Sequence, residues 1–165
     1  MNKMIFSLVF ISITTVVGCG DGTVTQTEVE RPIDVTDDSL FAGLKFSEDD
    51  AEYDLSRGEF LVAVLSATCD HCQKSVPIIN ESSATQELPQ VIGLVEGDET
   101  SLDNFVLTTN PAFPCFLIDI ESFFNLIESA PPRLLYVQDG KILNAWDGDL
   151  PGAEIVVESL VETHK

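Results

Sequence analysis

Basic side chains are scarce in this sequence. Lys and Arg together number eight against 28 Asp and Glu, which gives a formal net charge of -20 over 165 residues. A protein this acidic repels nucleic-acid phosphates and anionic lipid headgroups at moderate salt. The composition therefore argues against nucleic-acid binding, while the length allows one domain with a substantial hydrophobic core.

The apolar segment near the N-terminus is too short to span a bilayer comfortably. It runs from Ile5 to Val17, follows Lys3 and leads into Gly18-Cys19, the layout of an export signal. Val16-Val17-Gly18-Cys19 resembles the lipobox of bacterial lipoproteins, in which the cysteine is acylated and becomes the first mature residue. An uncleaved anchor, or an ordinary signal peptide with an incidental cysteine, remains the alternative.

The lipobox resemblance implies three parts for the chain. Residues 1–18 form a lipoprotein signal peptide, and 19–39 contain acylated Cys19 and a polar, flexible tether without apolar periodicity. Residues 40–165 form the folded domain. We expect an exported protein, anchored by lipid to a bacterial membrane, whose domain lies in the periplasm or otherwise outside the cytoplasmic membrane.

The pattern of apolar residues and turn signals predicts alternating strands and helices followed by a hairpin and a last helix. The expected strands are 60–65, 91–95, 133–137 and 142–146, with a turn at Asp139-Gly140, and the expected helices are 70–82, 100–107, 121–128 and 153–164. Thr100 or Ser101 is the expected cap of the second helix. This order indicates an α/β sandwich with a mixed sheet.

Two sets of apolar side chains are assigned to the interior. The last helix is expected to bury Ile155, Val156, Leu160 and Val161. The aromatic residues expected to pack the core and the segment between Asp98 and Glu128 are Phe105, Phe113, Phe116, Phe123 and Phe124. The alternative is that some of them line a groove for a partner.

Two cysteines follow a buried strand directly, in the stretch SATCDHCQKSVP from Ser66 to Pro77. Cys69 begins a helix, where unpaired N–H groups and the helix dipole stabilise a thiolate. Cys72 lies one turn deeper and can close a disulfide with it. The pair can be a structural disulfide, part of a metal site or a redox centre.

Histidine and cysteine are too few and too scattered to favour the metal reading. The candidate ligands are His71, His164 and the cysteines Cys69, Cys72 and Cys115. His71 lies between the two cysteines and His164 near the C-terminal end, which disfavours a closed tetrahedral site, so we expect no metal. With Cys19 acylated, the remaining three thiols are an odd number, which argues against a purely structural disulfide framework.

Further residues give the chain a resemblance to the thioredoxin superfamily, and more closely to its exported TlpA/ResA-like branch. They are DLSRGEF before the first strand, Cys69-Asp70-His71-Cys72, Pro77 in the helix, AFP at 112–114, Pro132 at the position of the family's cis-proline, Asp139-Gly140 and Gly148. The resemblance covers about residues 40–163. It implies a three-layer sandwich and a thiol-disulfide oxidoreductase without a cofactor.

The resemblance also implies roles for individual residues. Cys69 would attack, Cys72 would resolve the mixed disulfide, and Pro132 would hold the substrate-binding loop against them. Protein thiols and disulfides are the implied partners, reduction is the implied direction, and an exported reductase implies a membrane electron donor. The alternative is a redox-silent binding or scaffold lipoprotein that keeps the fold.

Several residues depart from the family pattern. Thr68 replaces a common aromatic residue, and Ala63 replaces a buried acid, so a proton relay would need another group. Pro131, before the cis-proline position, offers no N–H to a substrate backbone. Between the cysteines, His71 is expected to favour the thiolate and Asp70 to oppose it.

Cys115 has two open interpretations. Its apolar neighbours favour a small buried hydrophobe, and a third redox thiol is the alternative.

Overall fold

The computed structural model describes residues 40–41, 43–48 and 50–163, all of which belong to the unit Ile33–Lys165. The expected signal peptide, Cys19 and the expected tether lie outside the described residues. The elements in chain order are β1 (Lys45–Glu48), β2 (Ala51–Asp54), β3 (Glu59–Ser66), α1 (Asp70–Ala84), β4 (Gln90–Glu96), α2 (Glu99–Thr109), β5 (Cys115–Ile118), α3 (Ile120–Leu126), β6 (Arg133–Gln138), β7 (Lys141–Asp147) and α4 (Ala153–Thr163).

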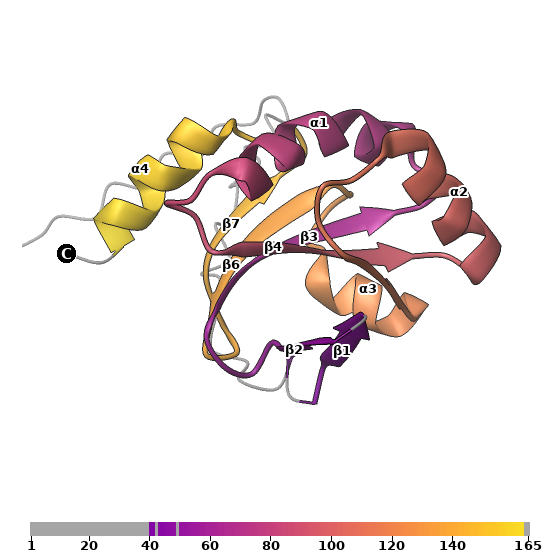
Figure 1. Cartoon of the computed structure of the whole chain (residues 1–165), viewed down its shortest axis with the longest axis horizontal. Coiled ribbons are helices and arrows are strands. Elements are labelled where there is room, and N and C mark those ends of the chain that lie inside the picture. Colours follow the sequence, from indigo (N-terminus) through magenta and orange to yellow (C-terminus); the bar gives the residue numbers. More distant parts are fainter. Residues whose placement is uncertain (1–39, 42, 49, 164–165) are drawn as a thin grey trace, which may run out of the picture. The chain divides into compact units, whose positions relative to one another are not determined.

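Five strands form a mixed sheet in the order β5-β4-β3-β6-β7. β3, β4 and β5 are parallel, whereas β6 runs antiparallel to both β3 and β7. In Figure 1, α1, α2 and α4 cover one face of this sheet, and α3 and the β1–β2 hairpin lie on the other. The expected three-layer α/β sandwich with a mixed sheet is confirmed.

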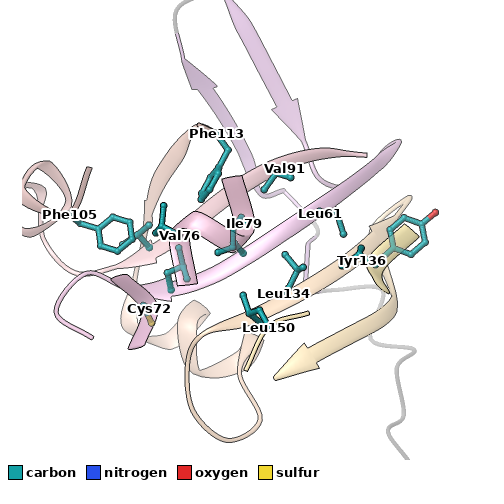
Figure 2. Close-up of a cluster of buried hydrophobic side chains, with 14 of the residues drawn as sticks. Leu61, Cys72, Val76, Ile79, Val91, Phe105, Phe113, Leu134, Tyr136 and Leu150 are labelled. Atoms are coloured by element: carbon teal, nitrogen blue, oxygen red, sulfur yellow. The ribbon is translucent and has the colours of Figure 1, made fainter. Parts of the chain in front are cut away.

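Alternate residues of β3 supply two separate cores, because successive side chains of a strand point to opposite faces. Leu61, Ala63 and Leu65 belong to the cluster under α1, α2 and α4, and Val62 and Val64 belong to the cluster under α3. All five are fully buried. Figure 2 shows the first cluster, to which Cys72, Val76 and Ile79 of α1 contribute.

The N-cap of the second helix lies two or three residues earlier than predicted. Its N-cap is Asp98, whose side chain accepts a hydrogen bond from the N–H of Ser101, while the Ser101 hydroxyl accepts from the N–H of Asp98. This reciprocal capping box satisfies two N–H groups that the helix itself cannot pair. Ser101 therefore belongs to the capping box as the third helical residue, and the prediction of Thr100 or Ser101 as N-cap was wrong.

Three apolar side chains assigned to the interior are exposed instead. Ile155 and Val161 of α4 are 55% and 54% exposed, while Val156 and Leu160 are buried. Residues four apart share a helix face, so 156 and 160 form the buried stripe and their neighbours turn away. Phe124 is 63% exposed beside buried Phe123 for the same reason.

Two short pairings between strands, β1 with β2 and β5 with β4, were not predicted from the sequence. The β1–β2 hairpin lacks a continuous apolar run, and β5 has four residues that follow a proline-rich segment. β5 lies close to β4 where β4 has Gly93. A Cβ on Gly93 would lie 2.9 Å from the Cys115 Sγ and 3.0 Å from a Phe113 ring carbon, so the missing side chain permits this packing.

Candidate active site

Cys69 is the N-cap of α1, three residues beyond the end of β3. Its backbone is extended, with φ -86° and ψ 114°, and its Sγ accepts a hydrogen bond from the N–H of Cys72 at 3.3 Å. The turn is closed by the Cys69 N–H, which donates to the Ser66 carbonyl at 3.2 Å. The half-buried sulfur therefore faces the positive end of a 15-residue helix, as the sequence predicts.

Cys72 lies beneath Cys69 and is fully buried in the cluster under α1. Its Sγ accepts a hydrogen bond from the N–H of Ser66 at 3.4 Å. Burial raises the pKa of the Cys72 thiol to about 12, and nearby Cys69 adds to the effect. Both cysteines are free thiols, one accessible and one covered.

A loop containing two prolines lies against the accessible sulfur. The Pro131–Pro132 peptide bond is cis, as expected for Pro132, and the Pro131 carbonyl oxygen lies 4.0 Å from the Cys69 Sγ. The Pro132 carbonyl accepts a hydrogen bond from the N–H of Gly148 at 3.0 Å, which ties this loop to the segment after β7. Residues more than 60 positions apart in the sequence thus meet at one sulfur.

Arg133, which sequence reasoning missed, anchors the same loop. It is 5% exposed. Its guanidinium donates to the Leu126 carbonyl at 3.1 Å and to Glu128 at 2.6 Å, and its Nε lies 3.1 Å from a carboxylate oxygen of Asp147. These contacts join the segment before the prolines to the end of β7. The only sequence signal was a charged residue at the start of a buried strand.

The two residues between the cysteines are exposed. Asp70 occupies the first turn of α1, and His71 Nε2 lies 3.3 Å from a carboxylate oxygen of Asp149. Asp149 itself is fully exposed, beyond the end of β7. This contact connects the start of α1 to the same segment that holds Pro132.

Cys115 does not join the pair. It faces Gly93 in the β4–β5 register, three residues before the end of β5, so it lies roughly 10 Å back from the sheet edge where Cys69 follows β3. Burial raises the pKa of its thiol to about 12, with a smaller contribution from Glu48. It packs half-buried against the core, which favours the structural interpretation over a third redox thiol.

Within the described residues, no group of three His, Cys, Asp or Glu side chains is arranged to hold a metal ion. His164 lies outside them. None of the helices described is long and apolar enough to cross a membrane.

No protein-family model and no curated protein matches this sequence. Several solved structures, in contrast, are similar to this chain.

The thioredoxin domain of a thiol-disulfide oxidoreductase from Bacteroides vulgatus matches with 17% identity and a TM-score of 0.53, over 72% of this chain and 91% of that one. A thioredoxin-family thiol:disulfide interchange protein from Chlorobium tepidum matches with 14% identity and a TM-score of 0.54, over 73% and 94%. StoA from Bacillus subtilis matches with 14% identity and a TM-score of 0.53, over 73% and 92%. At these identities the similarity concerns the fold, and this chain has a thioredoxin-like α/β fold.

Proposed function

We propose that this protein is an exported, membrane-tethered thiol-disulfide oxidoreductase that reduces protein disulfides. The observation that carries the proposal is the half-buried Cys69 sulfur, which accepts the Cys72 N–H at a helix N-terminus and faces the Pro131 carbonyl at 4.0 Å. A sulfur so placed is reachable by a substrate, and a helix N-terminus is a position typical of nucleophilic cysteines. The names of the similar structures, thiol-disulfide oxidoreductase and thiol:disulfide interchange protein, support the same activity.

In the proposed reaction, the Cys69 thiolate attacks one sulfur of a client disulfide. A Cys69–client disulfide forms, and the other client sulfur leaves as a thiolate that takes a proton from solvent. Cys72 then attacks Cys69 Sγ, which gives the Cys69–Cys72 disulfide and releases the second client thiol. Two electrons pass from the Cys69 thiolate and Cys72 thiol to the client, which takes up one proton from solvent and the one that Cys72 releases.

The difference between the two thiols determines which one attacks first. Cys72 is covered, and its raised pKa keeps it protonated at neutral pH, so it waits as the resolving thiol. Its proton leaves only when the mixed disulfide has formed, and the departing client thiolate takes up a proton in exchange. Ala63 supplies no acid for this transfer.

The remaining proposals concern location and electron supply. Cys19 is the proposed lipidation site, residues 1–18 the signal peptide, 19–39 the tether and 40–165 the catalytic domain. An exported reductase cannot draw on cytosolic thioredoxin directly, so we expect a membrane electron donor. Pro132 and Pro131 are the proposed substrate-binding residues, and Asp70 and His71 the proposed modulators.

Turnover of insulin disulfides with dithiothreitol as the electron source tests the activity. We expect Cys69→Ser to abolish the acceleration seen with the wild-type protein, because the attacking sulfur is lost. Cys115→Ser is the matched control and should retain it. Equal rates for wild type and Cys69→Ser would eliminate the enzyme and leave a redox-silent binding or scaffold protein.

Equilibration of the protein in glutathione buffers tests the direction. A dedicated reductase should have a reduction potential near that of thioredoxin, about -270 mV. A value in the glutaredoxin range, about -200 to -230 mV, or higher would contradict the reducing direction while leaving the exchange chemistry intact.

A further inference from the structure

A hollow of about 300 Å³ lies between α1 and α2, two helices that Figure 1 shows side by side on one face of the sheet. Two of its lining residues are attached to Cys69. Asp70 follows Cys69 in the chain, and Gln73 donates its N–H to the Cys69 carbonyl at 3.1 Å. One end of the hollow is therefore formed by direct neighbours of the proposed nucleophile. The full lining is Asp70, Gln73, Lys74, Pro77, Thr108 and Thr109.

Lys74 stands apart from the other basic residues that the structure describes. It is exposed at the hollow, and within the described part of the chain its ammonium forms no ion pair and no hydrogen bond. The ammonium of Lys74 is therefore available to an anionic group from outside. The other Lys and Arg side chains described, each of which has an interaction partner, are Lys45, Arg57, Arg133 and Lys141.

Asp70 supplies the opposite charge to the same hollow. It precedes Lys74 by one helical turn, so the two side chains share a face of α1, with about 6 Å of helix rise between them. Among the described residues no ion pair joins Asp70 to Lys74. Both charges are therefore open to one ligand, and the ligand that satisfies both has an ammonium and a carboxylate a few ångströms apart.

Neutral polar groups of the hollow fit the same ligand. The Thr109 hydroxyl donates to the Phe105 carbonyl at 2.7 Å, so its oxygen is left to accept a hydrogen bond. Pro77 has no N–H to give the Gln73 carbonyl, which lies four residues before it in α1. These acceptors suit an ammonium, which has three N–H donors and no acceptor. The exposed Thr108 hydroxyl can donate to a carboxylate.

We propose that this hollow binds the α-amino-acid group of small zwitterionic disulfides, of which cystine is the simplest, and that the protein reduces them. This inference rests on the proposed thiol-disulfide exchange. Asp70 binds the α-ammonium and Lys74 the α-carboxylate, and the disulfide of the bound ligand lies towards Cys69. The two side chains are specificity-determining residues for a further class of substrate, beside the protein disulfides.

The reaction with cystine follows the same two steps. The Cys69 thiolate attacks the sulfur of the half that occupies the hollow, and the other half leaves as a cysteine thiolate that takes a proton from solvent. Cys72 then attacks Cys69 Sγ, and the bound half leaves as a second cysteine with the proton that Cys72 releases. Two electrons pass from the protein to one cystine, which becomes two cysteines.

Four small disulfides separate the two charges of the ligand. Each half of cystine carries an ammonium and a carboxylate, cystamine has only the ammonium, 3,3′-dithiodipropionate only the carboxylate, and 2-hydroxyethyl disulfide neither. The full chain, reduced and held in a nonionic detergent, is mixed with each at about 0.1 M salt. Each second-order rate of Cys69 oxidation is divided by the rate of the same disulfide with 2-mercaptoethanol, which removes intrinsic reactivity.

The comparison of cystine with 2-hydroxyethyl disulfide is decisive, because neither has a net charge and the overall charge of the protein favours neither. We expect the normalised rate of cystine to be at least about threefold higher, since two exposed ion pairs form in the hollow. Equal normalised rates for these two disulfides would overturn the proposal.

Single substitutions assign the two charges. Relative to 2-hydroxyethyl disulfide with the same variant, Lys74→Met should slow cystine and 3,3′-dithiodipropionate about two- to fivefold and spare cystamine. Asp70→Asn should slow cystine and cystamine and spare 3,3′-dithiodipropionate. Lys141→Met is the matched control, because its strand partner Gln138 lies five residues, or roughly 17 Å, along β6 from Arg133 at the proline loop. Equal losses in Lys74→Met and Lys141→Met would overturn the assignment, since overall charge would then explain them.

A ligand that cannot be reduced separates binding from exchange. L-cystathionine has a methylene in place of one sulfur of cystine, and it should shift the amide resonances of Thr108 and Thr109 in isotope-labelled Cys69→Ser protein. The shifts should disappear when Lys74→Met is added. Absent shifts, with 2-hydroxyethyl disulfide reacting normally, would overturn the hollow as a binding site and leave the exchange activity intact. If 2-hydroxyethyl disulfide reacts no faster with wild type than with Cys69→Ser, the exchange and the reduction of cystine both fail, and persisting shifts would support the binding site alone.

Discussion

At the scale of single residues, the buried Cys72 thiol is expected to lower the free energy of unfolding as the pH becomes alkaline. The thiol pKa rises from an ordinary 9.0 to about 12 in the folded protein. Between these values the folded protein retains a proton that the unfolded chain has released, so the free energy of unfolding falls as pH rises from about 9 towards 12. Below pH 9 the contribution is fully present.

Urea unfolding of the reduced protein at pH 8.5, 9.5 and 10.5 measures this effect. Wild type should lose stability more steeply than Cys72→Ser, by up to about 1.4 kcal/mol per pH unit. Cys115→Ser should flatten the profile in the same way, because burial also raises the pKa of Cys115 to about 12. Parallel profiles for wild type and Cys72→Ser would show that the Cys72 thiol is not held protonated by folding.

At the scale of elements, the packing of β5 on β4 depends on the missing side chain of Gly93. A methyl group there would contact Cys115 Sγ at 2.9 Å and Phe113 at 3.0 Å, closer than packed atoms tolerate. We expect Gly93→Ala to destabilise the protein by about 1–3 kcal/mol, the usual range for overpacking. The measurement is the free energy of unfolding in urea.

A double variant gives this prediction its control. Cys115→Ala removes the nearer of the two obstructing atoms, so Gly93→Ala should cost less in that background than in wild type. The coupling energy between the two substitutions should be favourable. Both variants should leave the reaction of Cys69 unchanged, because Cys115 lies away from the cysteine pair. Additive losses would mean that Cys115 is not the group that Gly93 accommodates.

The elements that sequence reasoning recovered are those with strong local signals. β3 is a continuous apolar run, α1 starts at a capping cysteine, and Asp139-Gly140 takes the positive φ angles of 49° and 81° that its tight hairpin turn requires. β5 was missed because its pairing partner, rather than its four residues, makes it a strand. Arg133 was missed because its three contacts lie on two other segments, and no spacing along the chain reveals them.

For the candidate site, the sequence predicted that Cys69, Cys72 and Pro132 lie together, as they do in the structure, but it did not predict the contacts of the nearby acids. The contacts of Asp149 with His71 and of Asp147 with Arg133 exist only once β7 returns beside the proline loop. Asp70 was visible from its position between the cysteines. The meeting of the cysteines and the prolines was therefore predictable from the chain, whereas the contacts of Asp147 and Asp149 depend on the fold.

At the scale of the whole molecule, the charge of -20 constrains how the protein can stay on a membrane. So acidic a protein is repelled by anionic headgroups, which leaves hydrophobic anchoring as the available attraction. Several acyl chains at Cys19 would supply it, at about 0.8 kcal/mol for each buried methylene. The proposed tether of about 20 residues would then let the domain reach roughly 25 Å from the surface.

Metabolic labelling with a fatty acid, followed by membrane fractionation, tests this anchor. The wild-type protein should carry the label and stay with membranes in 1 M salt as well as in 0.1 M salt, because electrostatic attraction plays no part. Cys19→Ala should lose the label, while Cys115→Ala, the matched cysteine control, should keep it. A label that persists in Cys19→Ala would refute acylation at that residue. Unlabelled wild-type protein released into the soluble fraction would instead indicate an ordinary cleaved signal peptide, and clients would then be met without a membrane anchor.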